Sequence, residues 1–185
     1  MPERAPPPPT LSGLSIAEIA AIAAAHPDPP VDQWDPPFCG DSGMRIARDG
    51  TWFHDGTPIS RPAMVRLFSG LLRREPDGAY MLVTPVEKLA IAVDDAPFVA
   101  VELMTEGQER DRRLAFRLNT DRSVIAGANH PLTVRDGRPY LEVRPGIDAA
   151  IARAVYYELA DLALAEGADP AGLWSDGVRF SLDAA

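Results

Sequence analysis

Apolar residues recur at helical spacing near the start of the chain. The stripe consists of Ile16, Ile19, Ile22 and Ala23. Ser15 and Glu18 stand at the spacing of a capping box, in which the serine oxygen caps the helix and the glutamate reaches back to it. His26 precedes Pro27, and a residue before proline avoids the α region. The pattern therefore predicts a helix that begins at residue 16 and ends at His26.

Two further amphipathic helices are predicted later in the chain. In the first, Ser60 is the expected cap and Pro62 lies in the first turn, where proline is tolerated. Its apolar stripe consists of Met64, Leu67, Phe68, Leu71 and Leu72. In the second, Asp148 is the expected cap and Gly167 the expected end, since glycine readily closes a helix in a left-handed conformation. Its stripe consists of Ile151, Val155, Leu159 and Leu162.

Short apolar runs bounded by turn residues predict the strands. Asp-Gly pairs at 49–50 and 55–56 predict hairpin turns within a β-rich segment from 44 to 59. The other expected strands are 80–83, 89–93, 98–104, 114–118, 124–126, 132–135, 140–143 and a final hairpin at 174–180. The links between residues 89 and 118 are too short for parallel crossovers, so an antiparallel meander is expected there, with 94–97 as one of its turns.

A pattern in the first hairpin returns in the second half of the chain. Residues 44–50 and 131–137 both read as a strand that ends in Arg-Asp-Gly, and an aromatic-bearing strand, an isoleucine and a helix follow each. This predicts an internal duplication, although hairpin-then-helix units also recur independently. The expected fold class is α+β, with two similar β-hairpin/helix/strand motifs, a central antiparallel meander, helices packed on the sheets and an N-terminal helix. Whether the repeats form one sheet or two lobes stays open.

Four segments are expected along the chain. They are a disordered proline-rich tail at 1–13, the N-terminal helix and connector at 14–37, a first α+β lobe at 38–104 and a second at 105–185. The run from Pro6 to Pro9 carries the first of these expectations, because consecutive prolines favour polyproline II and cannot pack as a helix.

The amino-acid composition limits which cellular compartment and which kinds of partner are expected. The 185 residues carry a formal charge of −9 and one cysteine, Cys39. An acidic chain disfavours nucleic acid and anionic membranes, and a single thiol cannot form an intrachain disulfide. No apolar run approaches the ~20 residues that a membrane span needs, and the N-terminus lacks a signal pattern. These features predict a cytoplasmic protein that binds neither nucleic acid nor membrane.

Familiar catalytic and cofactor motifs are not found in the sequence. Residues 40–43 read Gly-Asp-Ser-Gly, as around a chymotrypsin-like nucleophile, but only a proline-rich connector separates them from His26, and a triad is defined by geometry. The three histidines lack metal-ligand spacing, and Cys39 has no second cysteine. Asp94 and Asp95 are explained by a turn, and no phosphate-binding loop is present. The sequence predicts no catalytic residue, no metal and no cofactor.

The best candidate binding surface is a polar and aromatic cluster around the first hairpin and the second predicted helix. Its members are Trp52, His54, Arg61, Arg73, Glu75, Glu87 and Lys88. If that helix packs on the sheet, these side chains meet along one rim. Arginines near a helix C-terminus are also favoured by the helix dipole, so a solvated face explains the same residues.

Several short motifs stand densely between Cys39 and Phe98. They include Cys39-Gly40-Asp41, Asp49-Gly50-Thr51-Trp52, Leu71-Leu72-Arg73-Arg74-Glu75, Val83-Thr84-Pro85-Val86-Glu87-Lys88 and Asp94-Asp95-Ala96-Pro97-Phe98. Together they resemble the signature of an uncharacterised proteobacterial family, a domain of unknown function of about this length, and the match continues more loosely from 114 to 164. The resemblance implies a two-domain α+β fold built from repeated motifs, with no established activity and a signalling role as the favoured guess. No catalytic residue carries over.

Three classes of function follow. The first is a non-enzymatic regulatory or signal-transduction module that recognises a protein partner or a small ligand. The second is an oligomeric scaffold, which would bury an apolar patch between copies and leaves a homodimer open. The third is an enzyme with an unfamiliar site that uses His54 with Asp55 or Glu87, in a pocket where one of them has a perturbed pKa.

Overall fold

The computed structural model describes residues 13–167 and 171–183, so the tail expected at 1–13 lies almost wholly outside the described residues. The helices are α1 (Ile16–Ala25), η1 (Val31–Gln33), α2 (Pro62–Gly70), η2 (Glu109–Asp111) and α3 (Arg153–Glu166). The strands of the first half are β1 (Phe38–Ile46), β2 (Trp52–His54), β3 (Thr57–Pro58), β4 (Leu72–Arg74), β5 (Tyr80–Val83) and β6 (Lys88–Val93). Those of the second half are β7 (Phe98–Glu106), β8 (Arg113–Leu118), β9 (Ser123–Ile125), β10 (Leu132–Arg135), β11 (Arg138–Arg144), β12 (Ile147–Ile151), β13 (Gly172–Ser175) and β14 (Val178–Ser181).

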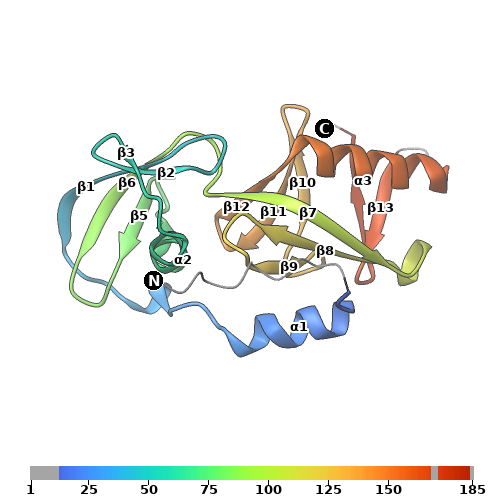
Figure 1. The fold of residues 1–185 in the computed structure, drawn as a ribbon, viewed down its shortest axis with the longest axis horizontal. Coiled ribbons are helices and arrows are strands. Elements are labelled where there is room, and N and C mark those ends of the chain that lie inside the picture. The colour runs from blue at the N-terminus through green and yellow to red at the C-terminus, as the bar shows by residue number, and fades with distance from the viewer. Residues whose placement is uncertain (1–12, 168–170, 184–185) are drawn as a thin grey trace, which may run out of the picture.

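Two six-stranded sheets have the same strand order. The first runs β3-β2-β1-β6-β5-β4, and the second, read from its β9 edge, runs β9-β8-β7-β12-β11-β10. Each sheet joins two antiparallel three-stranded units through one parallel pair, β1 with β6 and β7 with β12. The α+β class with two similar motifs is therefore confirmed, and the motifs form two lobes that lie side by side (Figure 1).

The equivalence of the two sheets corrects the register of the predicted repeat. Residues 44–50 belong to β1 and its turn, whereas residues 131–137 belong to β10 and its turn. By strand order β1 is the counterpart of β7, and β10 is the counterpart of β4. The shared Arg-Asp-Gly run therefore marks two hairpins at different positions in the repeat.

The structurally equivalent hairpins are β4-β5 and β10-β11, and they share more than their place in the sheets. Each has an Asp-Gly turn, at 77–78 and at 136–137, followed by a tyrosine on the next strand. In both, an arginine before the turn lies over that tyrosine ring. The guanidinium carbons of Arg74 and Arg135 lie 5.1 and 4.1 Å from the ring centroids of Tyr80 and Tyr140.

The link between the lobes differs from the prediction. Residues 94–97, expected as a hairpin turn within one meander, join β6 of the first sheet to β7 of the second. Strand β7 thus stands in the second lobe, whereas the expected boundary after residue 104 placed it in the first. The link is tied to both sheets, because Asp94 accepts a 2.9 Å hydrogen bond from Arg45 and Asp95 accepts a 2.8 Å bond from Tyr140. A four-residue link has the same sequence features whether the two strands it joins pair with each other or belong to separate sheets.

The helices follow the predicted pattern in part. Helix α1 has the expected capping box between Ser15 and Glu18. Arg61, and not Ser60, is the N-cap residue of α2; no side chain caps this helix, and it ends at Gly70. The predicted continuation through 71–74 is instead strand β4, since Leu72 pairs with Leu82 and is fully buried between the neighbouring elements. Pairing with β5 overrides the local helical spacing.

Helix α3 begins later than predicted. Residues 147–151 form β12, every residue of which is buried, and the helix starts at Arg153. Asp148 therefore caps no helix, and its carboxylate instead accepts a 2.7 Å hydrogen bond from Arg135. The expected end at Gly167 is confirmed, with a left-handed φ of 62°.

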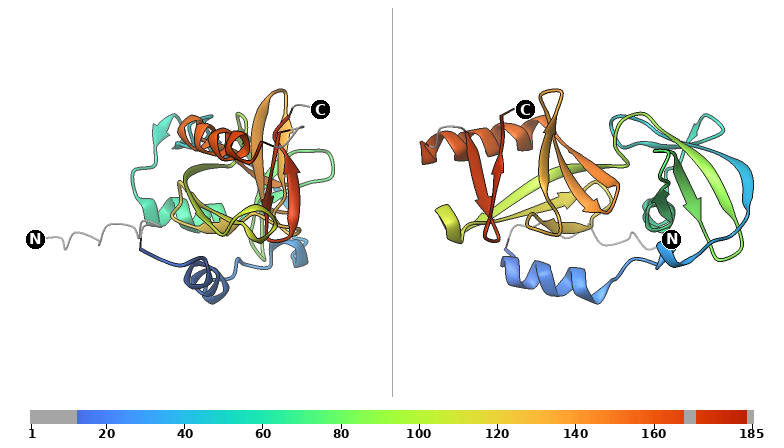
Figure 2. Two further views of the ribbon diagram at one scale, coloured as in Figure 1. Left: turned by 90° about the vertical axis from the view of Figure 1, so that its right-hand side faces the viewer. Right: turned by 180° about the vertical axis from the view of Figure 1, so that it is seen from behind.

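One contiguous apolar core extends through both lobes, from Trp52 and Leu72 of the first to Phe116 and Leu159 of the second. Helix α2 lies between the first sheet and the second lobe, and α1 runs along the outside of the second lobe beside β8 and β9 (Figures 1 and 2). Within the described residues no helix has the length and apolar character to cross a membrane.

Candidate functional site

Three residues of the predicted binding cluster do come together. Arg73 of β4 and Lys88 of β6 both pair with Glu75, at 2.6 and 3.8 Å. Arg73 also donates hydrogen bonds of 3.0 and 2.7 Å to the carbonyls of Val31 and Trp34. All three charged side chains are largely buried, so the group fastens the connector to the first sheet and presents little surface to a ligand.

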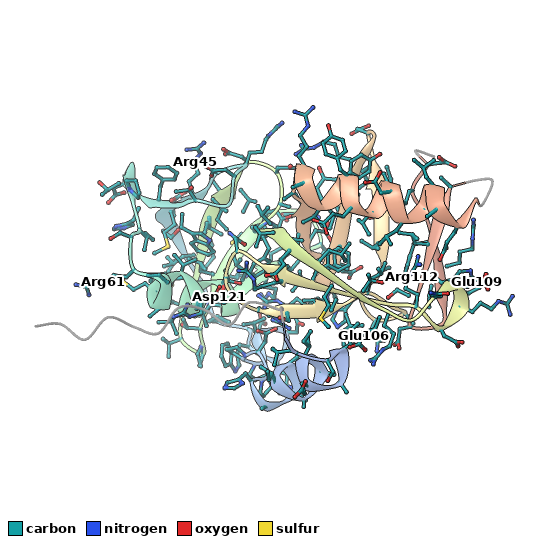
Figure 3. The ribbon with its side chains drawn as sticks, turned by 45° about the vertical axis from the view of Figure 1, so that its right-hand side comes forward. Arg45, Arg61, Glu106, Glu109, Arg112 and Asp121 are labelled. Atoms are coloured by element: carbon teal, nitrogen blue, oxygen red, sulfur yellow. The ribbon has the colours of Figure 1, made fainter. Side chains whose placement is uncertain are left out.

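The other four predicted residues are dispersed. Trp52 is 1% exposed and stacks on Phe68 with ring centroids 6.4 Å apart, so its indole belongs to the core and not to a rim. His54 lies on the surface 3.6 Å from the Asp55 carboxylate. Arg61 projects outward from the first lobe (Figure 3), and Glu87 is exposed in the turn before β6. These positions form no common site.

A groove of about 360 Å³ lies between α1, α2 and the β8–β9 turn, and is here called the inter-lobe groove. It takes walls from both lobes, since α2 belongs to the first and the turn to the second. Its apolar lining is Leu14, Ile19, Ile22, Ala23, Gly70 and Phe98. Its polar lining is His26, Asp28, Arg66, Ser69, Thr120, Asp121, Arg122 and Ser123. Clefts of this size between domains are common ligand sites.

Helix α1 forms the apolar wall and is anchored mainly through its first half. Ile16 and Ile19 are buried in a small core of their own with Ala115. The Glu106 carboxylate accepts a 2.7 Å hydrogen bond from the backbone N–H of Ile16, which satisfies one of the unpaired donors at the helix start (Figure 3). The second half of α1 is exposed, with Ile22 48% accessible. The helix thus overhangs the groove.

Ion pairs form the opposite wall. Arg122 donates to the Asp28 carboxylate, and the guanidinium of Arg144 lies 3.0 Å from the same oxygen. Arg66 of α2 donates a 3.2 Å hydrogen bond to Asp121 on the β8–β9 turn. The contacts connect the connector, the first lobe and the second lobe around one hollow.

Arg144 also contacts the C-terminal end of α2, next to this wall. Its guanidinium donates hydrogen bonds of 2.8 and 2.7 Å to the carbonyls of Ser69 and Leu72, at the end of α2. Burial lowers the pKa of Arg144 from its ordinary value, and the nearby carboxylate of Asp28 opposes that shift. A residue of β11 therefore holds the C-terminal end of a helix in the other lobe, where unpaired carbonyls need donors.

One polar group in the groove wall has no partner. The side chain of Thr120 is 94% buried by its relative exposure of 6%, and its Oγ1 makes no hydrogen bond among the described residues. An unsatisfied buried hydroxyl costs free energy, about 1–3 kcal/mol from mutational data. This oxygen is also closed to solvent, with less than 1 Å² of accessible surface.

Comparison with known families assigns the chain as a whole. Residues 29–96 match the N-terminal domain of DUF1285, a domain of unknown function, and residues 97–182 match the C-terminal domain of the same family. The chain belongs to the DUF1285 family. The two matched parts meet within the link at 94–97, which is also where the two sheets separate.

Two solved structures resemble this DUF1285 chain. A DUF1285 family protein from Silicibacter pomeroyi DSS-3 is 45% identical, with a TM-score of 0.73, over 88% of this chain and 93% of that one. A DUF1285 family protein from Shewanella baltica OS155 is 25% identical, with a TM-score of 0.52, over 64% of this chain and 91% of that one. No functionally curated protein matches the chain.

The groove residues of this DUF1285 chain were not predicted as a site, although one signal pointed to them. The segment 16–25 carries a single charged residue, Glu18, so its apolar surface exceeds the one face that a surface helix buries. The extra apolar surface of such a helix indicates a contact with another part of the protein or with a bound molecule. Arg66 and Arg122 gave no signal, because 56 positions separate them and only the fold brings both to the groove.

Proposed function

We propose that this DUF1285 chain is a non-enzymatic regulatory module that binds a small ligand in the inter-lobe groove. The observation that carries the proposal is the composition of its walls, which come from α1, the first lobe and the second lobe. Apolar lining with a few convergent polar groups is what small-molecule sites usually have. Among the described residues no group of three or more His, Cys, Asp or Glu side chains gathers as metal ligands do.

Binding at this position would couple to the arrangement of the lobes. A ligand that contacts α2 and the β8–β9 turn together binds best at one separation of the two, and therefore shifts the population toward that arrangement. The overhanging half of α1 would respond as well, since it has few other contacts. A partner protein that reads the position of α1 or of the lobes would then sense the ligand.

A thermal-shift screen tests whether the groove binds anything at all. The full chain is heated with panels of metabolites, nucleotides and amphiphilic acids, amines and alcohols. A ligand at 100 times its Kd adds about 2.7 kcal/mol to the free energy of unfolding, which raises the melting temperature measurably. Saturable stabilisation by at least one compound is expected.

Two tryptophan variants locate any hit. Ala23 lines the groove and is exposed, so Ala23→Trp fills the hollow without disturbing the core. Ala21 is on the opposite side of the same helix, since two residues turn an α-helix by about 200°, and Ala21→Trp is the matched control. Stabilisation should vanish in Ala23→Trp and persist in Ala21→Trp. Hits that survive in both variants, or no hit at all, would refute a ligand site in this groove.

A second candidate function is self-association along α3. Tyr157 and Leu164 are 54% and 74% exposed, and their spacing of seven residues places them on one helix face. Sedimentation velocity across a concentration series, compared with a Leu164→Glu variant, tests this: a homodimer that the variant dissociates supports it, and a monomer at every concentration rules it out.

A further inference from the structure

The two walls of the inter-lobe groove differ in chemistry, and the difference identifies a class of ligand. This argument rests on the proposed function and specifies it further. On one side, Leu14, Ile19 and Ile22 present aliphatic side chains. On the other, Arg66 and Arg122 contribute guanidinium groups. A molecule that satisfied both walls would be amphipathic, with an apolar body against α1 and a polar head against the β8–β9 turn.

The arginines favour an anionic head. Arg66 donates through Nη1 to Asp121, and Arg122 donates through Nη1 to Asp28. A guanidinium has five N–H donors in a rigid fork, so each of these side chains keeps donors for a planar acceptor. Asp28 is moreover shared with Arg144, and Asp121 with Arg117 at 3.4 Å. Each lining carboxylate therefore already serves two arginines.

The same aspartates limit the charge of that head. A dianion such as a phosphate monoester would lie close to both Asp28 and Asp121, and like charges in a partly desolvated site repel strongly. A singly charged carboxylate meets less repulsion and fits the bidentate geometry of arginine. A carboxylate is therefore the head group that these side chains favour.

The apolar wall favours an unbranched aliphatic body. Residues 19–25 of α1 are all alanine or isoleucine, yet this part of the helix is mostly exposed, and Ile19, Ile22 and Ala23 line the groove. A second hollow of about 280 Å³ adjoins the other flank of α1 and shares Ile19, Ala23, Arg122 and Ser123 with the first. The hollows thus border the same residues of α1, and a flexible chain can follow both more readily than a compact ring system.

We infer that the inter-lobe groove binds a medium-chain aliphatic carboxylate, with its carboxylate at Arg66 and Arg122 and its chain against α1. The ligand is inferred to be free in solution, and the vesicle measurement below tests a membrane-bound chain instead. This assigns the exposed apolar surface of α1 to a small molecule.

Titration calorimetry with four probes tests the class. Decanoate is compared with decyl phosphate, decylamine and acetate, all below micellar concentration, on the full chain. Decanoate should bind saturably at one site, and each of the other three should bind at least ten-fold more weakly. Equal or tighter binding of decylamine or decyl phosphate would overturn the carboxylate assignment, and equal binding of acetate would overturn the role of the chain.

Arginine variants test the position of the head group. Arg66 is half exposed in a surface ion pair, which contributes little to folding, so Arg66→Gln should fold normally. It should weaken decanoate at least ten-fold, because one partner of the carboxylate is lost. Arg61→Gln removes the same charge from an exposed position outside the groove and should leave the affinity unchanged. Equal affinities in the two variants would refute the proposed pose.

Two further outcomes distinguish failure of the carboxylate assignment from failure of the proposed ligand-binding function. If decanoate fails but another compound stabilises the chain in an Ala23-dependent manner, the groove is a ligand site and only the carboxylate class is wrong. If no compound gives such stabilisation, both fail. Flotation with phosphatidylcholine vesicles tests membrane binding. If the chain binds the vesicles, and Ala21→Trp and Ala23→Trp change that binding equally, α1 is a membrane contact. That result would overturn the proposal of a ligand free in solution.

Discussion

At the scale of single residues, this molecule depends on arginines that reach across its parts. Arg73 fastens the connector to the first sheet, and Arg144 reaches from β11 to the end of α2. A guanidinium does this well because it keeps its charge when buried and serves several carbonyls at once. The arginines of this acidic chain thus make specific contacts between residues that lie far apart in sequence.

Replacement of Arg144 should lower the free energy of unfolding. Arg144→Met leaves the Ser69 and Leu72 carbonyls and one side of Asp28 without a donor. We expect a loss of about 3 kcal/mol in the free energy of unfolding, at the lower end for a broken buried charge pair, because Arg122 still serves Asp28. Urea denaturation measures the loss. Arg153→Met, at an exposed position, should change it by less than about 0.5 kcal/mol, and similar losses in both variants would contradict this role for Arg144.

The Tyr140 hydroxyl predicts an alkaline loss of stability. Burial, and then its hydrogen bond to Asp95, raises the pKa of Tyr140 above the ordinary value of 10.0. Because the folded pKa exceeds the unfolded one, this contribution is complete below pH 10 and is lost as the pH rises through the folded value. Unfolding measured between pH 9 and 11.5 should show a decline that Tyr140→Phe reduces. Tyr157→Phe, on the outer face of α3, is the control and should keep the full decline.

At the scale of elements, local signals decided where helices and turns begin, and pairing partners decided what the segments between them became. The hairpin turn at Asp136-Gly137 shows the first case, with φ values of 50° and 70° that asparagine, aspartate and glycine tolerate best. Strand β4 shows the second, since residues 72–74 have helical spacing in sequence but extend beside β5.

The capping box of α1 should control how often this helix opens. Ser15→Ala removes the cap and should destabilise the helix by about 1 kcal/mol. Because α1 has its own small core, the effect should be local: faster hydrogen exchange in residues 20–25, with little change in the global melting temperature. Ser60→Ala is the matched control, since Ser60 precedes α2 without capping it. Unchanged exchange in Ser15→Ala would show that the tertiary contacts alone hold α1.

The same cap should respond to acid. Hydrogen bonds from the Ser15 backbone and hydroxyl hold the pKa of Glu18 below its ordinary value of 4.5. A lowered carboxylate pKa gives stability that is present above pH 4.5 and disappears as the pH falls through the lower value. Exchange in α1, corrected for its intrinsic pH dependence, should therefore accelerate as the pH falls below 4.5. Glu18→Gln should abolish this acid dependence.

At the scale of the whole molecule, two matched family domains share one core. The sheets are separate, but the buried side chains of both lobes form a contiguous cluster, and Arg144 and Asp95 connect the lobes. Interfaces that are extensive and apolar suppress independent domain motion. The lobes therefore should behave as one cooperative unit, with ligand-dependent movement confined to small shifts around the groove.

Tryptophans in the two lobes provide a test of this cooperativity. Trp52 is buried in the first lobe and Trp174 lies on β13 beside the second. Two variants that each retain one of them, with the other tryptophans changed to phenylalanine, report the lobes separately. Coincident urea transitions in each variant by fluorescence and by circular dichroism are expected for one unit. Transitions that differ by more than the experimental error would show two independent domains.

Local features could be predicted from the sequence: the Ser15 cap of α1, the Asp-Gly hairpins, the end of α3 at Gly167 and most strands to within a few residues. Capping, glycine conformations and apolar alternation act between neighbouring residues, so a single sequence reveals them. Three features depend on tertiary packing: the sheet that β7 joins, the strand at residues 72–74, and the burial of Trp52 in the core. The groove belongs to the second group, since its contact between Asp28 and Arg122 joins positions 94 residues apart. Such pairings depend on how the sheets assemble, and no periodicity along the chain records them.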